Sequence, residues 1–111
     1  MQSKFHNRKT FYKGVIYDSK KEAKRAYELD LLRRAGFISN YERQRRFILQ
    51  DGFKIRGKSI RAITYVADFY YYDNNKKTWV VEDTKGFRTD VYKLKKKLFL
   101  YKYPDIVFIE S

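Results

Sequence analysis

Apolar and polar residues alternate with a helical period after residue 18. Ser19 is a suitable helix N-cap with Glu22 three residues later, which is the pattern of a capping box. Gly36 follows a basic last turn, where a helix commonly ends. We therefore expect a helix between Ser19 and Gly36, preceded by a short extended segment over residues 14–18.

A second helix is expected in the segment "VYKLKKKLFLYKY". Thr89 or Asp90 can cap its start, and Pro104 stops it. Its apolar residues recur at spacings of three and four, which predicts one buried stripe and an outward lysine-rich face. The stripe expected in the core is Val91, Leu94, Leu98 and Tyr101, and the lysines expected to face outward are Lys93, Lys96 and Lys97.

Between and after the helices the pattern is typical of strands. The first strand is expected near Arg46–Gln50, followed by a turn at Asp51-Gly52 and a basic return segment. "AITYVADFYYY" and "TWVVEDTK" read as two strands joined by the polar turn "DNNKK", and "DIVFIE" as a last one. The order helix, three strands, helix, strand predicts an α/β (α+β) fold with a mixed sheet flanked by helices.

Length and charge set the broad class. The 111 residues suffice for one domain, residues 1–111, with a basic N-terminal arm over residues 1–13. There is no cysteine and no apolar run of membrane-spanning length, so we expect a soluble protein without a thiolate metal site. Twenty-six Lys and Arg against thirteen Asp and Glu give a net charge of +13, which favours a polyanion such as nucleic acid. An acidic protein partner is the alternative.

Acidic residues interrupt the two strands on either side of "DNNKK". Asp is among the poorest strand formers, and a buried carboxylate costs desolvation energy. A two- or four-residue loop centred on Asn75-Lys76 sets Asp68 directly opposite Asp83, whereas an odd-length loop would bring Glu82 to the Asp68 face. Even loops are at least as common, so the pairing of Asp68 with Asp83 is favoured.

Two opposed carboxylates repel each other by about 3–4 kcal/mol at an effective dielectric constant near 20. Lys85 lies two residues beyond Asp83 on the same strand face and can offset that repulsion in a simple salt bridge. A divalent cation is the other compensating charge, because Mg²⁺ binds one or two carboxylates together with water. For Glu22 a capping role and a ligand role remain equally open.

These residues resemble the PD-(D/E)xK nuclease superfamily, whose restriction-endonuclease-like core has the order αβββαβ. "YDSKKEA", "YVADFYYY" and "VVEDTKG", followed by the lysine-rich helix, are similar to small phage and prophage endonucleases related to Holliday-junction resolvases. The likeness spans roughly residues 10–109. Ala67 stands where the superfamily name has proline.

The resemblance implies a metal-dependent DNA endonuclease acting on branched or structured phage DNA. Asp68, Asp83 and the carbonyl of Thr84 would hold Mg²⁺ or Mn²⁺, with Glu22 directly or through water, and Lys85 would be catalytic. Glu82 is the alternative second acid. The resemblance further implies the cytoplasm of a bacterial host and no small-molecule cofactor. Because junction resolution needs two symmetric cuts, we also expect a homodimer. Six basic residues are candidate phosphate contacts: Arg45, Arg46, Arg88, Lys93, Lys96 and Lys97.

Overall fold

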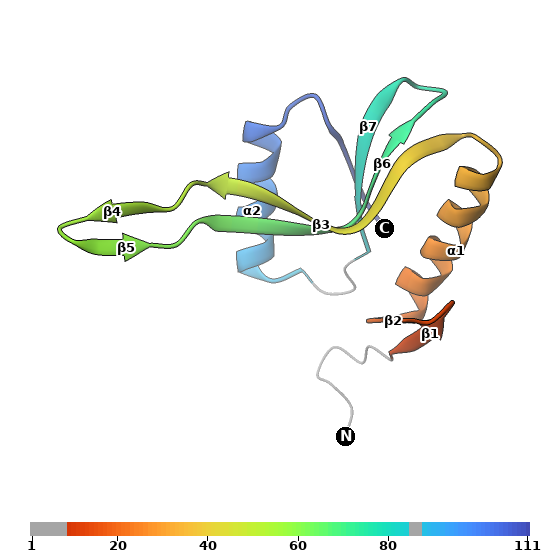
Figure 1. The fold of residues 1–111 in the computed structure, drawn as a ribbon, viewed down its shortest axis with the longest axis horizontal. Helices are drawn as coiled ribbons and strands as arrows, with labels where there is room; N and C mark the ends of the chain where they lie inside the picture. Colours follow the sequence, from red (N-terminus) through yellow and green to blue (C-terminus); the bar gives the residue numbers. More distant parts are fainter. Residues whose placement is uncertain (1–8, 85–87) are drawn as a thin grey trace.

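A computed structural model describes residues 9–84 and 88–111 of the chain (Figure 1). Within these ranges no helix is long and apolar enough to cross a membrane. The elements are β1 (Thr10–Tyr12), β2 (Val15–Tyr17), α1 (Lys20–Arg34), β3 (Ile38–Gln50), β4 (Phe53–Ile55), β5 (Lys58–Ile60), β6 (Ile63–Asp73), β7 (Thr78–Asp83), α2 (Asp90–Lys102) and β8 (Val107–Glu110).

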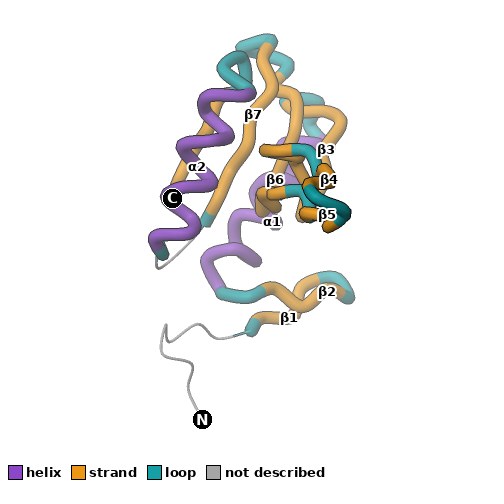
Figure 2. Tube along the Cα trace, turned by 90° about the vertical axis from the view of Figure 1, so that its left-hand side faces the viewer, coloured by secondary structure: helices purple, strands orange, loops and turns teal. Residues whose placement is uncertain are grey.

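The central sheet has the strand order β3-β6-β7-β8. The first two pairs are antiparallel, and β8 returns through α2 to pair with β7 in parallel. Adjacent residues of β7 point to opposite faces, so Val80 packs in the cluster that contains α1 and Val81 in the cluster that contains α2. The two helices thus cover opposite faces, with α2 alongside β7 in Figure 2. This confirms the α+β class with a mixed sheet flanked by helices.

The ends of α1 confirm the sequence signals. The Ser19 Oγ accepts a hydrogen bond from the Glu22 amide at 3.1 Å, and Gly36 adopts a positive φ of 84° just after the helix. The α1 residues Ala23, Ala26 and Leu29 are buried against the sheet. The small Ala side chains let α1 lie close to the sheet.

The ends of α2 were also predicted correctly, with Thr89 as the N-cap, but its buried face was not. Tyr92 and Phe99 are buried, whereas Val91, Leu94 and Tyr101 are exposed. The helix carries two apolar stripes, and the aromatic one is buried because the sheet surface it meets is itself aromatic. Phe99 packs edge-on against Phe47 and Tyr65 at ring-centroid distances of 5.1 and 5.5 Å.

Two hairpins differ from the sequence prediction. β1 and β2 pair with each other, so residues 10–12 of the expected arm form a strand, while residues 1–8 lie outside the described ranges. Asp51-Gly52 is not a hairpin turn but the junction between β3 and β4. The turn lies at Arg56-Gly57, where both φ angles are positive, as a two-residue type I′ turn requires.

Candidate active site

The loop between β6 and β7 determines which acid faces Asp68. Asp73 pairs with Thr78 and Phe69 with Glu82, so the loop has four residues, Asn74 to Lys77. The even loop length that was predicted is therefore confirmed, and continuing this register by one step beyond the pair of Phe69 with Glu82 would set Asp68 opposite Asp83.

Asp68 also lies at a break in the strand alternation. Side chains two apart normally share a face, yet Tyr65 and Ala67 pack in the α2 cluster while Phe69 and Tyr71 pack in the α1 cluster. On β3, the residue between the pairs Arg43–Phe69 and Arg45–Ala67 is Gln44, which has a positive φ of 55°. The side chains of β6 therefore change face at Asp68, between Ala67 on the α2 side and Phe69 on the α1 side. A positive φ in a non-glycine strand residue is uncommon and is often found near functional sites.

Asp68 is buried and tied to the end of β7. Its Oδ2 accepts hydrogen bonds from the backbone amide of Thr84 at 2.8 Å and from the Thr84 hydroxyl at 2.9 Å. No described residue donates a hydrogen bond to its Oδ1. The two bonds fix the carboxylate and leave that oxygen for a ligand.

Asp83 is fully buried on the α2 side. Its Oδ2 accepts a hydrogen bond of 2.6 Å from the hydroxyl of Tyr65, and its backbone carbonyl accepts one from the Ser111 amide at 3.0 Å. Burial raises the pKa of Tyr65, and the negative charge of Asp83 raises it further. Tyr65 therefore stays protonated and keeps donating to Asp83 throughout the physiological pH range.

Glu82, the alternative acid, points to the opposite face and is held by an arginine. Arg25 on α1 donates from Nε and Nη2 to the two carboxylate oxygens, each at 2.7 Å, and the Tyr71 hydroxyl donates a third hydrogen bond. Such a bidentate pair satisfies both oxygens of the carboxylate. Glu82 is thus a structural ion-pair partner, and the geometry favours Asp83 as the second acid of the site.

Glu22 turns toward the sheet instead of completing the capping box. Its Oε2 accepts a hydrogen bond from Arg43 Nη2 at 3.2 Å, and only 4% of the residue is exposed. Burial and the negative charge of Asp68 raise the pKa of Glu22 to about 7, against the lowering effect of Arg43. Arg43 pairs with Phe69 on β6, so its ion pair with Glu22 brings this α1 residue toward the strand segment that contains Asp68.

Arg43 is a residue of this site that the sequence did not single out, although it lies within "ERQRR". Its guanidinium lies 4.1 Å above the ring of Tyr17, and its Nε is buried without a hydrogen-bond partner among the described residues. Buried donors are nearly always satisfied. An unpaired donor beside Glu22 therefore suits an anionic oxygen or an ordered water.

The raised pKa of Glu22 predicts a pH-dependent stability. The folded-state pKa of about 7 exceeds the ordinary value of 4.5, so ionising Glu22 opposes folding. In EDTA we expect the free energy of unfolding to fall by roughly 3 kcal/mol as Glu22 ionises, between about pH 5 and pH 8. Urea unfolding at several pH values measures this, and Glu22→Gln should flatten the profile. An equally steep decline in Glu22→Gln would show that another group is responsible.

The donor set fits a hard divalent cation. Among residues 9–84 and 88–111, no group of three or more His, Cys, Asp or Glu side chains converges closely enough to hold a metal ion. Asp68 is nevertheless bonded to Thr84, the residue after Asp83, and Mg²⁺ commonly uses one or two carboxylates and fills its other positions with water. A cation here would also relieve the repulsion between Glu22 and Asp68. Lys85 lies outside the described residues.

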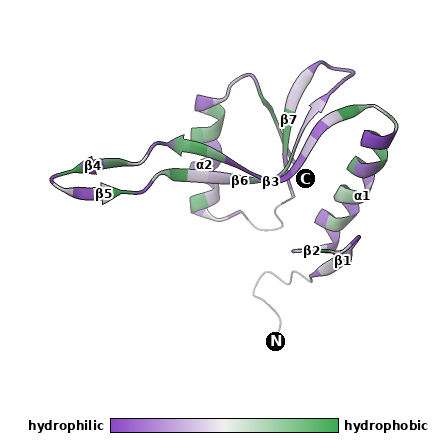
Figure 3. Ribbon diagram, in the orientation of Figure 1, coloured by the Kyte–Doolittle hydropathy of each residue, from purple (hydrophilic) through white to green (hydrophobic). Residues whose placement is uncertain are grey.

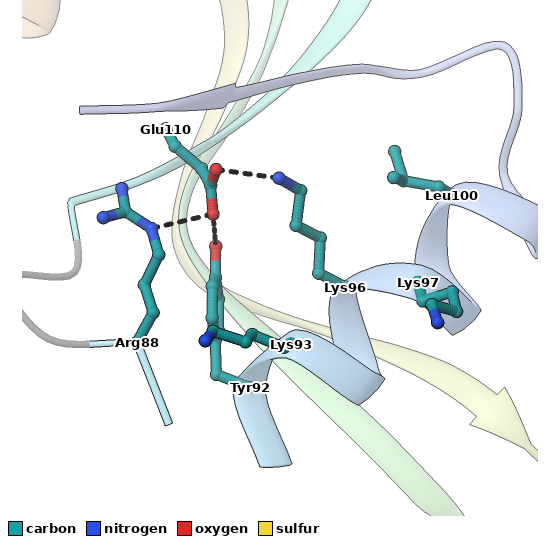
Figure 4. Close-up of a pocket in the computed structure, with 7 residues that line it drawn as sticks. All are labelled: Arg88, Tyr92, Lys93, Lys96, Lys97, Leu100 and Glu110. Carbon is teal, nitrogen blue, oxygen red and sulfur yellow. Dashed lines mark hydrogen bonds and ion pairs between the residues drawn. The ribbon is translucent and has the colours of Figure 1, made fainter. Parts of the chain in front are cut away.

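Four of the six candidate phosphate contacts lie together beside β8. Arg88, Lys93, Lys96 and Lys97 line a pocket of about 390 Å³ between α2 and Glu110 (Figure 4). Glu110 accepts from Lys96 at 2.7 Å, from Tyr92 at 2.7 Å and from Arg88 at 3.0 Å. Burial raises the pKa of Glu110, but these bonds outweigh it and lower the pKa to about 2. Lys93 and Lys97 are the exposed cations of this surface.

Arg45 and Arg46 lie on β3, apart from that pocket. Arg45 pairs with Glu42 at 2.8 Å and stacks over Tyr70, and Arg46 donates weakly to Thr64 at 3.5 Å. The six candidate phosphate contacts therefore lie on two separate basic surfaces of the described structure, one on β3 and one beside α2.

The fold and the site define a small α+β protein with buried acidic residues where two strands of a mixed sheet end, and with basic surfaces on β3 and α2. The sequence matches the family described as "Protein of unknown function (DUF1064)" over residues 2–109, and the chain belongs to that family. No curated protein and no solved structure matches the chain.

Proposed function

We propose that the protein is a metal-dependent DNA endonuclease of the PD-(D/E)xK type that acts on branched or structured DNA. The opposition of Asp68 and Asp83 at the end of the β6–β7 pair, with Glu22 approaching from α1, is the observation that carries the proposal. The element order αβββαβ of the core and the net charge of +13 support it. The resemblance adds a phage or prophage setting and a bacterial cytoplasm.

In this proposal the residues of the chain have separate roles. Asp68, Asp83 and the Thr84 carbonyl would hold Mg²⁺ or Mn²⁺, with Glu22 directly or through water. A bound divalent ion would lower the pKa of the attacking water and would neutralise negative charge on the scissile phosphate. Arg43 Nε offers a donor to a phosphate oxygen, and Lys85 neutralises charge in the transition state.

Incubation of supercoiled plasmid and synthetic four-way junctions with Mg²⁺, Mn²⁺ or EDTA tests the activity. Cleavage that depends on the metal supports the nuclease. DNA that is retarded in a gel but remains intact with every metal would instead indicate a non-catalytic nucleic-acid-binding module. Absence of both would favour a basic protein that binds another protein. Resolution of a junction needs two symmetric cuts, so the proposal includes a homodimer.

The lysines on α2 predict a steep salt dependence of DNA binding. Each phosphate contact contributes a slope of about −0.9 to log K against log salt. Lys96 is bonded to Glu110, so its reversal would disturb the fold. Changing the exposed Lys93 and Lys97 together to Glu should reduce the slope by about 2, as fluorescence anisotropy in EDTA measures. An unchanged slope would remove α2 from the DNA surface.

A further inference from the structure

The β4–β5 ribbon, residues 51–62, lies outside the central sheet. In the described part of the chain β4 and β5 form a sheet of their own, and every residue from Asp51 to Ile63 is exposed. Figure 1 shows the ribbon extending away from both helices. A two-stranded hairpin alone is only marginally stable in water, so a ribbon held out in this way suits a surface that a partner covers.

The ribbon has a defined shape. Arg56 and Gly57 form its type I′ turn, with φ angles of 50° and 77°. At its base a Cβ on Gly52 would lie 3.1 Å from the carbonyl oxygen of Ile60, so a larger residue there would crowd the opposing backbone. Six residues at about 3.3 Å each give a projection of roughly 20 Å.

Apolar residues gather on one face of the ribbon. Phe53 and Ile60 are directly opposed and Ile55 follows on the same face, and 46%, 39% and 53% of these residues are exposed. Lys54 and Ser59 are opposed on the other face. The alternation of hydrophobic and hydrophilic residues along the ribbon is visible in Figure 3.

The charge of the ribbon indicates what covers it. Residues 51–62 contain one acidic residue, Asp51, and four basic residues: Lys54, Arg56, Lys58 and Arg61. Two ribbons packed face to face would bring these like charges together, which disfavours a second copy of the chain. A polyanion complements them. Lys58 also shares the apolar face, so a partner there must accept cationic and apolar groups side by side, as the edges and walls of a nucleic-acid groove do.

We propose that the β4–β5 ribbon binds in a groove of duplex DNA. The major groove of B-DNA, about 12 Å wide, admits a two-stranded ribbon. Phe53, Ile55 and Ile60 contact sugars and base edges such as thymine methyl groups, and the flanking cations contact phosphates. This inference rests on the proposed function only in taking DNA as the polyanion, and it places a second DNA contact away from the acidic site.

Three variants test the ribbon. The first replaces residues 51–62 by Asn-Gly, because Gln50 already pairs with Ile63 and a two-residue loop closes that pair. The second is Lys54→Gln, Arg56→Asn, Lys58→Gln and Arg61→Gln together, and the third is Phe53→Ser with Ile60→Ser. Phe11→Ser with Ile16→Ser is the matched control, since this pair is opposed and exposed on the β1–β2 hairpin.

Binding to a labelled duplex of about two helical turns is measured in EDTA, so cleavage plays no part. We expect the deletion to raise Kd by about tenfold or more, the charge variant to reduce the salt slope by about 2 to 4, and the control to match the unaltered chain. Binding to duplex RNA should change less, because its deep, narrow major groove excludes the ribbon.

Unchanged duplex-DNA affinity and slope in the ribbon variants would overturn the inference, as would an equal loss for duplex RNA. A dimer that becomes a monomer on deletion, with unchanged DNA affinity, would assign the ribbon to a second copy instead. Circular dichroism verifies that each variant is folded. Because the binding assay omits metal, it does not depend on cleavage. Failure of the protein to cleave DNA would not affect the conclusion about the ribbon, and unchanged binding by the ribbon variants would not affect the cleavage result.

Discussion

Replacement of Asp83 by Asn is expected to lower metal-dependent DNA cleavage by roughly a hundredfold or more. An amide oxygen is a poorer ligand for Mg²⁺ than a carboxylate. The same change should raise the melting temperature in EDTA by a few degrees. The Asn carbonyl can still accept the hydrogen bond from Tyr65, while one of two opposed buried charges is removed.

The controls for Asp83→Asn separate chemistry from folding. Asp105→Asn removes a negative charge from an exposed loop and should leave both cleavage and melting temperature unchanged. DNA binding by Asp83→Asn in EDTA should be equal or tighter, because a negative charge is lost near the DNA. Retained cleavage together with a lower melting temperature would contradict the metal-binding role and indicate a structural carboxylate.

Local signals predicted most of the fold. Ser19, Gly36 and Thr89 specified helix ends because caps depend on a few neighbouring residues. The register of β6 and β7 followed from one short loop, and with it the opposition of Asp68 and Asp83. Asp51-Gly52 misled the prediction because it is as good a turn dipeptide as Arg56-Gly57, and only the pairing of distant strand residues decides between them.

Long-range packing could not be predicted in the same way. α2 has two apolar stripes, and the aromatic surface of β3, β6 and β8 determines which one is buried. Arg25 and Glu82 are 57 residues apart, so their pairing has no local signature. Likewise "ERQRR" indicates a basic strand, but it does not indicate which arginine points into the protein. In the structure Arg43 points inward to Glu22, next to the positive φ of Gln44.

The Arg25–Glu82 pair changes one expectation that the sequence supported. With Glu82 facing away from Asp68, the strand pattern alone predicts that Glu82→Gln affects neither cleavage nor stability. The structure shows Glu82 99% buried and bonded to Arg25 and Tyr71, so Glu82→Gln removes the buried negative charge and leaves the half-buried Arg25 guanidinium with the more exposed Glu28 as its carboxylate partner among the described residues. We expect a loss of roughly 3 kcal/mol in the free energy of unfolding, or roughly 12 °C in melting temperature.

A double-mutant cycle measures that pair directly. Arg25→Met and Glu82→Leu should each destabilise the protein, whereas the two changes together should recover most of the loss, because neither charge then stays buried alone. Arg33→Gln breaks the exposed Arg33–Asp30 pair and should cost less than about 1 kcal/mol. Cleavage per folded molecule should persist in Glu82→Gln, because Arg25 and Tyr71 already hold both oxygens of the Glu82 carboxylate. Loss of cleavage in a folded Glu82→Gln, with Asp83→Asn fully active, would assign the second acid of the site to Glu82.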